Sequence, residues 1–116
     1  MASAKVERRR RIRMRIRNKL VGTATRPRLS VFRSNKGIYC QLIDDMSGRT
    51  LTQANSRESG VKGVTKTEAA KAVGQLIAQR SQGLNVKHIL FDRGGYLYHG
   101  RVKALAEGAR EGGMTF

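Results

Sequence analysis

Acidic residues and cysteine are scarce in this sequence, and each shortage excludes a class of protein. Only 8 Asp and Glu accompany 24 Lys and Arg in 116 residues, for a formal net charge of +16. With so few acids, the carboxylate cluster that a two-metal nuclease needs is not evident. Cys40 is the single cysteine and the two histidines are far apart in sequence, so a disulfide framework is excluded and no structural zinc site is expected.

Tryptophan is absent and aromatic residues make up 5% of the chain, so the core must consist mainly of Val, Ile, Leu and Ala. No apolar run approaches the roughly 18 residues of a membrane-spanning helix. The charged N-terminus lacks the apolar stretch of a secretory signal, and it has too little Ser for a typical organellar transit peptide. We therefore expect a soluble protein of a reducing compartment.

Positive charge is concentrated near the N-terminus. Residues 1–28 hold eleven Lys and Arg and one acid, Glu7, whereas residues 29–116 hold thirteen Lys and Arg and seven acids. This gradient indicates a basic arm attached to a more ordinary body. We assign residues 1–25 to the arm and residues 26–116 to one globular α/β domain, which is long enough for one modest core.

Residues 11–17 alternate basic and apolar side chains, as a strand would, but Ile12, Ile16 and Leu20 also recur at helical spacing. Arg and Met favour helices, and Gly22 stands where a helix would end. We therefore expect a helix, which repulsion between like charges weakens until an anionic partner binds. Arginine forks match phosphate oxygens, so a polyphosphate such as RNA is the expected partner.

A solvated tail and a membrane-surface helix are the alternative interpretations of the arm. A tail needs no isoleucines, and the arginines encircle the helix without the clean polar half that a membrane-surface helix presents. The apolar side chains indicate instead that the arm packs, either on its own body or in an RNA groove.

Turn residues divide the body into a predicted order of three strands, a helix, a fourth strand and a last helix. Short turns make the first three strands an antiparallel meander. The helix after the capping box at Thr65 and Glu68 can cross over and place the fourth strand parallel to a strand of this meander. The fourth strand is the most continuously apolar, so we expect it at the centre of the sheet. The expected strands are residues 29–33, 38–44, 49–55 and 86–91, and the expected helices are residues 66–82 and 101–110.

Periodicity also predicts which side chains face the core. In the second strand, Ile38, Cys40 and Leu42 share one face, and Tyr39, Gln41 and Ile43 share the other. Gly108 weakens the last helix by about 1 kcal/mol relative to Ala. The residues expected to face inward from that helix are Val102, Leu105, Ala106 and Ala109.

A glycine-rich loop, residues 92–103, is a second candidate RNA-binding segment. Adjacent glycines allow close backbone approach, rings stack on unpaired bases, and the helix start near Gly100 offers N–H groups to a phosphate. Tyr96 and Tyr98 flank Leu97, so one of the two is expected in the core, and which one faces RNA stays open. The alternative is a merely structural loop.

The first two strands are a third candidate, because small polar and aromatic residues alternate there on a basic background. Ser30, Phe32, Ser34, Tyr39 and Gln41 would suit an RNA-facing sheet surface. For Phe32, core packing and base stacking both remain open.

Enzyme interpretations are weak. Asp44 and Asp45 are adjacent, which suits a turn, and Asp92 with His99 would act as a general acid–base pair only in a geometry that nothing in the sequence supports. The serines lack a partnered His–Asp pattern, no phosphate-binding P-loop is present, and Cys40 in a strand is typical of a small buried apolar residue.

Three segments carry a resemblance to a known family: "RPRLSVFRSNKGIYCQLIDD", "TKTEAA" and "FDRGGYLYHGRVKALAEGAREGGM". In their order and spacing they resemble the bacterial ribosomal protein L18 family of the large subunit, over essentially the whole chain. The resemblance implies binding of 5S ribosomal RNA and its attachment to 23S ribosomal RNA in the central protuberance of the cytoplasmic ribosome, beside other large-subunit proteins. It also implies a ribonuclease-H-like fold, which does not imply nuclease activity, and it implies no cofactor.

The resemblance also implies three groups of RNA contacts. The arm contributes Arg8, Arg9, Arg10, Arg11, Arg13, Arg15, Arg17 and Lys19. The first strand and turn contribute Arg26, Arg28, Ser30, Phe32, Arg33, Ser34 and Asn35. The loop and last helix contribute Arg93, Tyr96, Tyr98, His99, Gly100, Arg101 and Lys103. A nuclease on the same fold and a general nucleic-acid chaperone are the rival functions.

Overall fold

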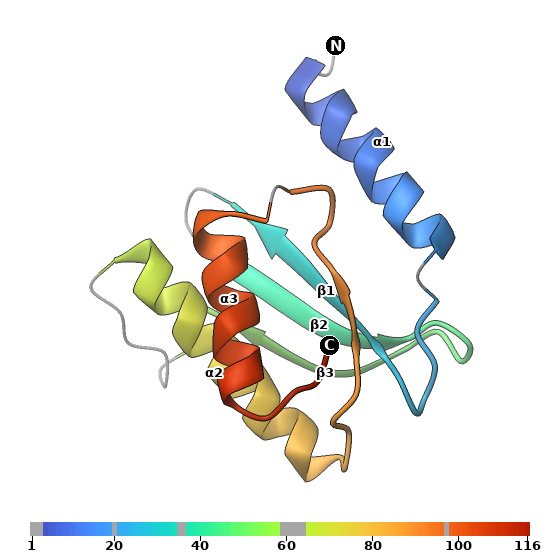
Figure 1. Ribbon diagram of the computed structural model, residues 1–116, viewed down its shortest axis with the longest axis vertical. Helices are drawn as coiled ribbons and strands as arrows, with labels where there is room; N and C mark the ends of the chain where they lie inside the picture. The colour runs from blue at the N-terminus through green and yellow to red at the C-terminus, as the bar shows by residue number, and fades with distance from the viewer. Residues whose placement is uncertain (1–3, 20, 35–36, 59–64, 97) are drawn as a thin grey trace.

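The chain folds into an α/β structure in which a four-stranded sheet carries two helices on one face, with an N-terminal helix beside it (Figure 1). The computed structural model describes residues 4–19, 21–34, 37–58, 65–96 and 98–116, and residues 16–19 by their backbone alone. The elements are α1 (Ala4–Lys19), β1 (Arg28–Arg33), β2 (Ile38–Asp44), β3 (Arg49–Asn55), α2 (Lys66–Gly83), β4 (Leu90–Asp92) and α3 (Gly100–Glu111). This order confirms the predicted α/β class and succession of elements. No helix in the described part of the chain is long and apolar enough to cross a membrane.

The first three strands form the predicted antiparallel meander, with β1 paired to β2 and β2 paired to β3. The other neighbour of β1 is β4, and this pair is parallel, as a helical crossover requires. Side chains of β2 alternate as expected, since Ile38, Cys40 and Leu42 are buried while Tyr39 and Gln41 lie on the opposite face.

The expected central position of the fourth strand is wrong, because β4 lies at the edge of the sheet. It is also only 3 residues long. The C-terminal tail, and not a further strand, covers its apolar residues. The backbone N–H of Ile89 donates to the carbonyl of Thr115 at 3.1 Å, and the rings of Phe91 and Phe116 stack with centroids 5.3 Å apart. A continuously apolar segment therefore indicates burial here without indicating a central strand.

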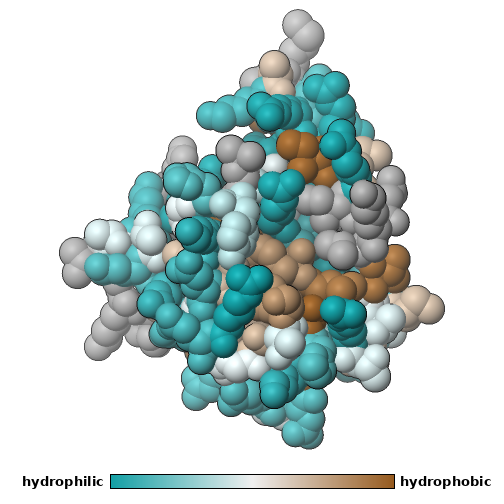
Figure 2. Space-filling model, in the orientation of Figure 1, coloured by the Kyte–Doolittle hydropathy of each residue, from teal (hydrophilic) through white to brown (hydrophobic). Residues whose placement is uncertain are grey.

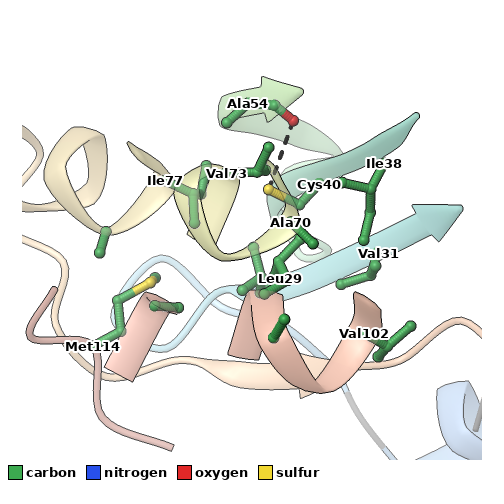
Figure 3. Close-up of a cluster of buried hydrophobic side chains, with 14 of the residues drawn as sticks. Leu29, Val31, Ile38, Cys40, Ala54, Ala70, Val73, Ile77, Val102 and Met114 are labelled. Carbon is green, nitrogen blue, oxygen red and sulfur yellow. Dashed lines mark hydrogen bonds between the residues drawn. The ribbon is translucent and has the colours of Figure 1, made fainter. Parts of the chain in front are cut away.

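The core lies between the sheet and helices α2 and α3 (Figure 3). Aliphatic residues such as Leu29, Ile77 and Leu105 are fully buried in it, as the scarcity of aromatic residues predicted. Cys40 belongs to this core, where its thiol donates to the carbonyl oxygen of Ala54 at 3.7 Å. Burial raises the pKa of the Cys40 thiol to about 12, so the residue acts as a small apolar side chain.

Local signals in the sequence fix the ends and faces of the two core helices. The Thr65 hydroxyl accepts a hydrogen bond from the backbone N–H of Glu68 at 3.1 Å, which confirms the predicted cap of α2. Helix α2 ends at Gly83, one residue beyond the expected end. The four residues predicted to face inward from α3 are all buried.

Helices α2 and α3 approach each other closely at two glycines. A Cβ atom on Gly74 would lie 2.1 Å from the carbonyl oxygen of Leu105, and one on Gly108 would lie 2.2 Å from that of Lys71. Neither distance is compatible with a side chain. Gly108 thus lowers the helix propensity of α3, but it also lets the two helix backbones touch.

Candidate nucleic-acid interface

The face of the sheet opposite α2 and α3 presents polar and aromatic side chains. Because successive residues of a strand point to opposite faces, Ser30 and Phe32 project away from the buried Leu29 and Val31. Phe32 is 56% exposed, so the core interpretation of this residue is excluded. Its ring centroid lies 6.1 Å from that of Tyr39, its cross-strand partner. We call this surface the open face; its residues, which line a hollow of about 280 Å³, are Ser30, Phe32, Tyr39, Gln41, Gln53 and Asn55.

Gln53 and Asn55 extend the open face beyond the residues that the sequence suggested. Strand β3 places Gln53 opposite Gln41, and Asn55 opposite Tyr39. An irregularity in the pairing between Leu42 and Ile43 shifts the register by one residue, so alternation counted across the turn would have placed Thr52 and Ala54 on this face instead. No local pattern in the sequence identifies Gln53 and Asn55.

Arg28 is not part of the open face, although it was expected to contact RNA. It is buried, and its guanidinium donates to Asp92 at 2.7 Å and to Asp45 at 2.9 and 3.0 Å. The hydrogen bond with Asp45 raises the pKa of Arg28, with Asp92 contributing in the same direction. Two carboxylates, from the turn after β2 and from the end of β4, accept hydrogen bonds from all three nitrogens of the guanidinium, so the fold itself uses this side chain.

Asp44, Asp45 and Asp92 are used structurally. Asp92 is fully buried and accepts from the backbone N–H of Gly94 at 2.8 Å in addition to its contact with Arg28. Asp45 also accepts from the N–H of Gly22 at 2.7 Å, which ties the root of the arm to the body. Asp44 accepts from the N–H of Met46 at 3.0 Å, as a turn residue does. Among the described residues, no group of three or more His, Cys, Asp and Glu could hold a metal ion.

The two tyrosines of the loop before α3 have different surroundings. Tyr96 is only 7% exposed, and its hydroxyl donates to the carbonyl oxygen of Arg33 at 3.0 Å. Tyr98 is 41% exposed. The structure therefore settles the alternative that the sequence left open: Tyr96 is the core tyrosine, and Tyr98 is accessible to a ligand.

Tyr98 belongs to an aromatic group at the sheet edge, formed with Phe91, Arg110 and Phe116. Its ring meets that of Phe91 edge-on with centroids 6.2 Å apart, and Arg110 donates to its hydroxyl at 3.1 Å. Arg110 also lies over the Phe116 ring, 4.3 Å from its centroid. Apolar side chains gather over β4 and the C-terminal end, with hydrophilic ones around them (Figure 2). Sequence reasoning missed Phe91, Arg110 and Phe116 because three separate segments supply them.

Arg101 supports the turn between β1 and β2. Its guanidinium donates to the carbonyl oxygen of Ser34 at 2.9 Å. Burial lowers the pKa of Arg101, and the nearby charge of Arg33 lowers it further. Arg101 therefore contributes a hydrogen bond to the fold while it remains partly exposed, so removing it would affect the backbone at Ser34 as well as the surface charge.

The other predicted contacts of the body lie at or near the surface. Arg26, His99, Gly100 and Lys103 are exposed, and Arg33, Ser34 and Arg93 are half-buried. His99 precedes α3, and its side chain does not cap the helix. Lys103 is 4.0 Å from Glu107 in an exposed ion pair, which contributes little to stability. Asn35 lies outside the described residues.

Helix α1 rests against the loop at Gly95 and Tyr96. The guanidinium of Arg9 lies 5.1 Å from the centroid of the Tyr96 ring, and Ile12 and Arg13 are half-buried. The side chains of Arg17 and Lys19 lie outside the described ones. The remaining predicted arm contacts, Arg8, Arg10, Arg11 and Arg15, are exposed.

Comparison with known proteins gives one consistent family. The sequence model of the family described as "Ribosomal L18 of archaea, bacteria, mitoch. and chloroplast" matches residues 3–116. The large ribosomal subunit protein uL18 of Limosilactobacillus reuteri is 60% identical over 108 residues, which cover 93% of this chain and 92% of that protein. The protein of the same name from Lysinibacillus sphaericus is 58% identical over 103 residues, covering 88% of this chain and 87% of that protein.

Proposed function

The chain belongs to the ribosomal L18 family, and on that premise we propose that it binds 5S ribosomal RNA and helps to attach it to 23S ribosomal RNA in the central protuberance. It is a structural, non-enzymatic constituent of the large ribosomal subunit and belongs to the cytoplasmic ribosome. Its proposed partners are the two RNAs and other large-subunit proteins of the same region.

The open face is the observation that carries the RNA-binding proposal. An exposed phenylalanine, a tyrosine and four polar side chains lie together on a sheet surface that no core helix covers. Unpaired RNA bases stack on such rings, and amide and hydroxyl groups pair with base edges. Tyr98 offers a further exposed ring, and the exposed arginines of α1 offer charge to phosphates.

We assign different tasks to these surfaces. Arginines of α1 are numerous, and they are expected to meet phosphate and to strengthen binding to any RNA. The rings of Phe32 and Tyr98 have fixed places on the body, so they are expected to meet bases that only the right RNA presents. Arg28 and Tyr96 are left out of this proposal because the fold uses both.

The test of this function is the affinity for 5S RNA relative to a scrambled RNA of equal length, measured by gel shift. Phe32→Ala and Tyr98→Ala should each weaken 5S binding by about 1–3 kcal/mol and weaken binding to the scrambled RNA less. Met46→Ala is the matched control, because Met46 is a large exposed side chain in the turn after β2 and outside both surfaces. Tyr96→Ala should instead lower the melting temperature, since its ring is buried.

Equal affinity of the unaltered protein for both RNAs would support a general nucleic-acid chaperone and overturn the proposal. Metal-dependent cleavage of either RNA would establish a nuclease. If neither ring variant changes the ratio of the two affinities, the open face and Tyr98 do not read the RNA.

The division into arm and body gives a second prediction. No described residue of α1 belongs to the buried core, and the N–H of Gly22 is held by Asp45. A chain that begins at Gly22 should therefore fold and melt cooperatively, as measured by circular dichroism. A spectrum typical of random coil would show that the body needs its arm.

A further inference from the structure

A cleft of about 230 Å³ lies between helix α1 and the loop that leads into α3. Four cationic side chains line it: Lys5, Arg8 and Arg9 from α1, and Arg33 from β1. No Asp or Glu is among the described residues that line it. Like charges gathered at one cleft repel one another, and an anion bound in the cleft would be attracted to each of them and so offset that repulsion.

Tyr96 fixes two of these cations in place. The guanidinium of Arg33 lies 5.2 Å from the centroid of its ring, and that of Arg9 lies 5.1 Å from it. The ring itself is anchored in the body by its hydroxyl, which donates to the Arg33 carbonyl oxygen. The cleft is therefore organised by a buried side chain and does not depend on flexible surface cations alone.

Gly95 brings the arm close enough to form the cleft. A Cβ atom on this residue would lie 2.3 Å from the backbone carbonyl oxygen of Arg9, so only glycine allows the helix to rest there. Gly95 also has a φ of +84°, which L side chains rarely adopt. The arm thus has a defined seat on the body.

The start of α3 borders the same cleft through Gly100. His99 is the residue before this 12-residue helix, and its side chain accepts no hydrogen bond from the first N–H groups of α3. N–H groups of this kind bind phosphate oxygens in many proteins. The start of α3 at Gly100 therefore offers backbone donors at the edge of the cleft, in addition to the four cations.

We propose that this cleft binds a backbone phosphate of the RNA, which then joins the arm to the body. The inference rests on the proposed RNA-binding function and gives it a specific site. A phosphate suits the cleft because its several oxygens accept from guanidinium, ammonium and backbone donors that converge from different elements. Such a contact is independent of base identity, so the same loss is expected on any RNA when it is removed.

Arg8→Gln tests the site, with Arg10→Gln as its matched control. Both arginines are exposed on α1 and both changes remove one charge, but Arg8 lines the cleft and Arg10 is not among the residues that line it. At one salt concentration, Arg8→Gln should weaken binding of the full chain to oligouridylate at least about tenfold more than Arg10→Gln does, by fluorescence anisotropy. Equal losses would overturn the proposal.

A second pair of variants tests the seat of the arm. Gly95→Ala should reproduce the loss seen with Arg8→Gln, because the added methyl group pushes the arm away from the loop. Gly48→Ala introduces the same kind of positive-φ strain, but a Cβ there meets nothing within 4 Å. Gly48→Ala should bind RNA like the unaltered protein. If it loses as much affinity as Gly95→Ala, the effect comes from backbone strain, and the contact between α1 and the loop at Gly95 does not contribute to RNA binding.

Adding a small anion or an acidic peptide shows which class of ligand the cleft prefers. Inorganic pyrophosphate, added at constant ionic strength, should shift the NMR amide signals of Gly95 and Gly100 in the unaltered protein but not in Arg8→Gln. If pyrophosphate does so while both arginine variants bind RNA equally, the cleft takes free anions and the RNA assignment is wrong. Displacement of oligouridylate by polyglutamate at lower concentration than by pyrophosphate would indicate an acidic peptide and would also overturn it.

Failure of this site and failure of the proposed function give different results. Equal affinity of the unaltered protein for 5S RNA and scrambled RNA contradicts the proposed function alone. The difference between Arg8→Gln and Arg10→Gln on oligouridylate tests the cleft alone, because that RNA has no sequence to recognise.

Discussion

Replacing Arg28 with alanine is expected to lower the free energy of unfolding by about 3–5 kcal/mol, the usual cost of removing one partner from a buried ion pair. Asp92 is fully buried, and the change deprives its carboxylate of the guanidinium contact at 2.7 Å. Asp45 loses two hydrogen bonds at the same time. Urea denaturation followed by circular dichroism measures the loss.

Arg26→Ala is the control for removing a nearby positive charge. Arg26 is exposed, so its replacement should change stability by no more than about 0.5 kcal/mol. The loss in Arg28→Ala is attributed to the buried charge of Asp92, which no longer has the guanidinium beside it. Adding Asp92→Asn to that variant removes this charge and should restore part of the lost stability, because an amide oxygen still accepts from the N–H of Gly94. A loss below about 1 kcal/mol in Arg28→Ala, or no recovery in the double variant, would contradict this account.

Binding to 5S RNA is expected to weaken steeply with salt. If the protein contacts about six to ten phosphates, the logarithm of the affinity should fall with the logarithm of the salt concentration at a slope of roughly −4 to −9. Between about 50 and 200 mM salt, a fourfold change, this is a loss of roughly 250-fold at the shallow end of that range and on the order of 100,000-fold at the steep end. Counterions released from the RNA by the arginines supply this dependence, which gel shifts at four or five salt concentrations would measure.

The chain that begins at Gly22 separates the share of the arm from that of the body. This shorter chain lacks nine of the 24 Lys and Arg residues of the full chain. Its slope should be shallower by several units, with a smaller part left to the cations of the body. A nearly flat slope for the full chain would rule out the electrostatic mechanism, and equal slopes for the two chains would remove the arm from it.

Much of the fold follows from local patterns in the sequence. The alternation in β2, the cap at Thr65 and the helical spacing in α3 each involve residues within a few positions of one another, and the structure confirms all three. Such patterns report which side of an element is buried. They do not report what buries it, which is why β4 was expected at the centre of the sheet although the C-terminal tail covers it.

The candidate site was harder to predict because its decisive contacts are distant in sequence. A basic residue beside a proline resembles a surface contact, yet the partners of Arg28 stand 17 and 64 residues away. The roles of Tyr96 and Tyr98 could not be separated by alternation alone, since the anchor of Tyr96 is the carbonyl of Arg33, 63 residues distant. The seat of the arm at Gly95 likewise depends on a backbone atom of Arg9 that no local pattern identifies.

The pairing of β1 with both β2 and β4 has a consequence for the order in which the body folds. Short turns connect the meander, whereas the contact between Arg28 and Asp92 closes a segment of 64 residues. Compared with the 17-residue segment to Asp45, this closure costs about 1 kcal/mol more in chain entropy, at about 0.6 kcal/mol per doubling of length. We therefore expect the meander to assemble first and β4 to dock after the rate-limiting barrier. Asp92→Asn should then speed unfolding and leave the folding rate nearly unchanged in stopped-flow measurements, whereas slower folding would place the docking of β4 before the barrier.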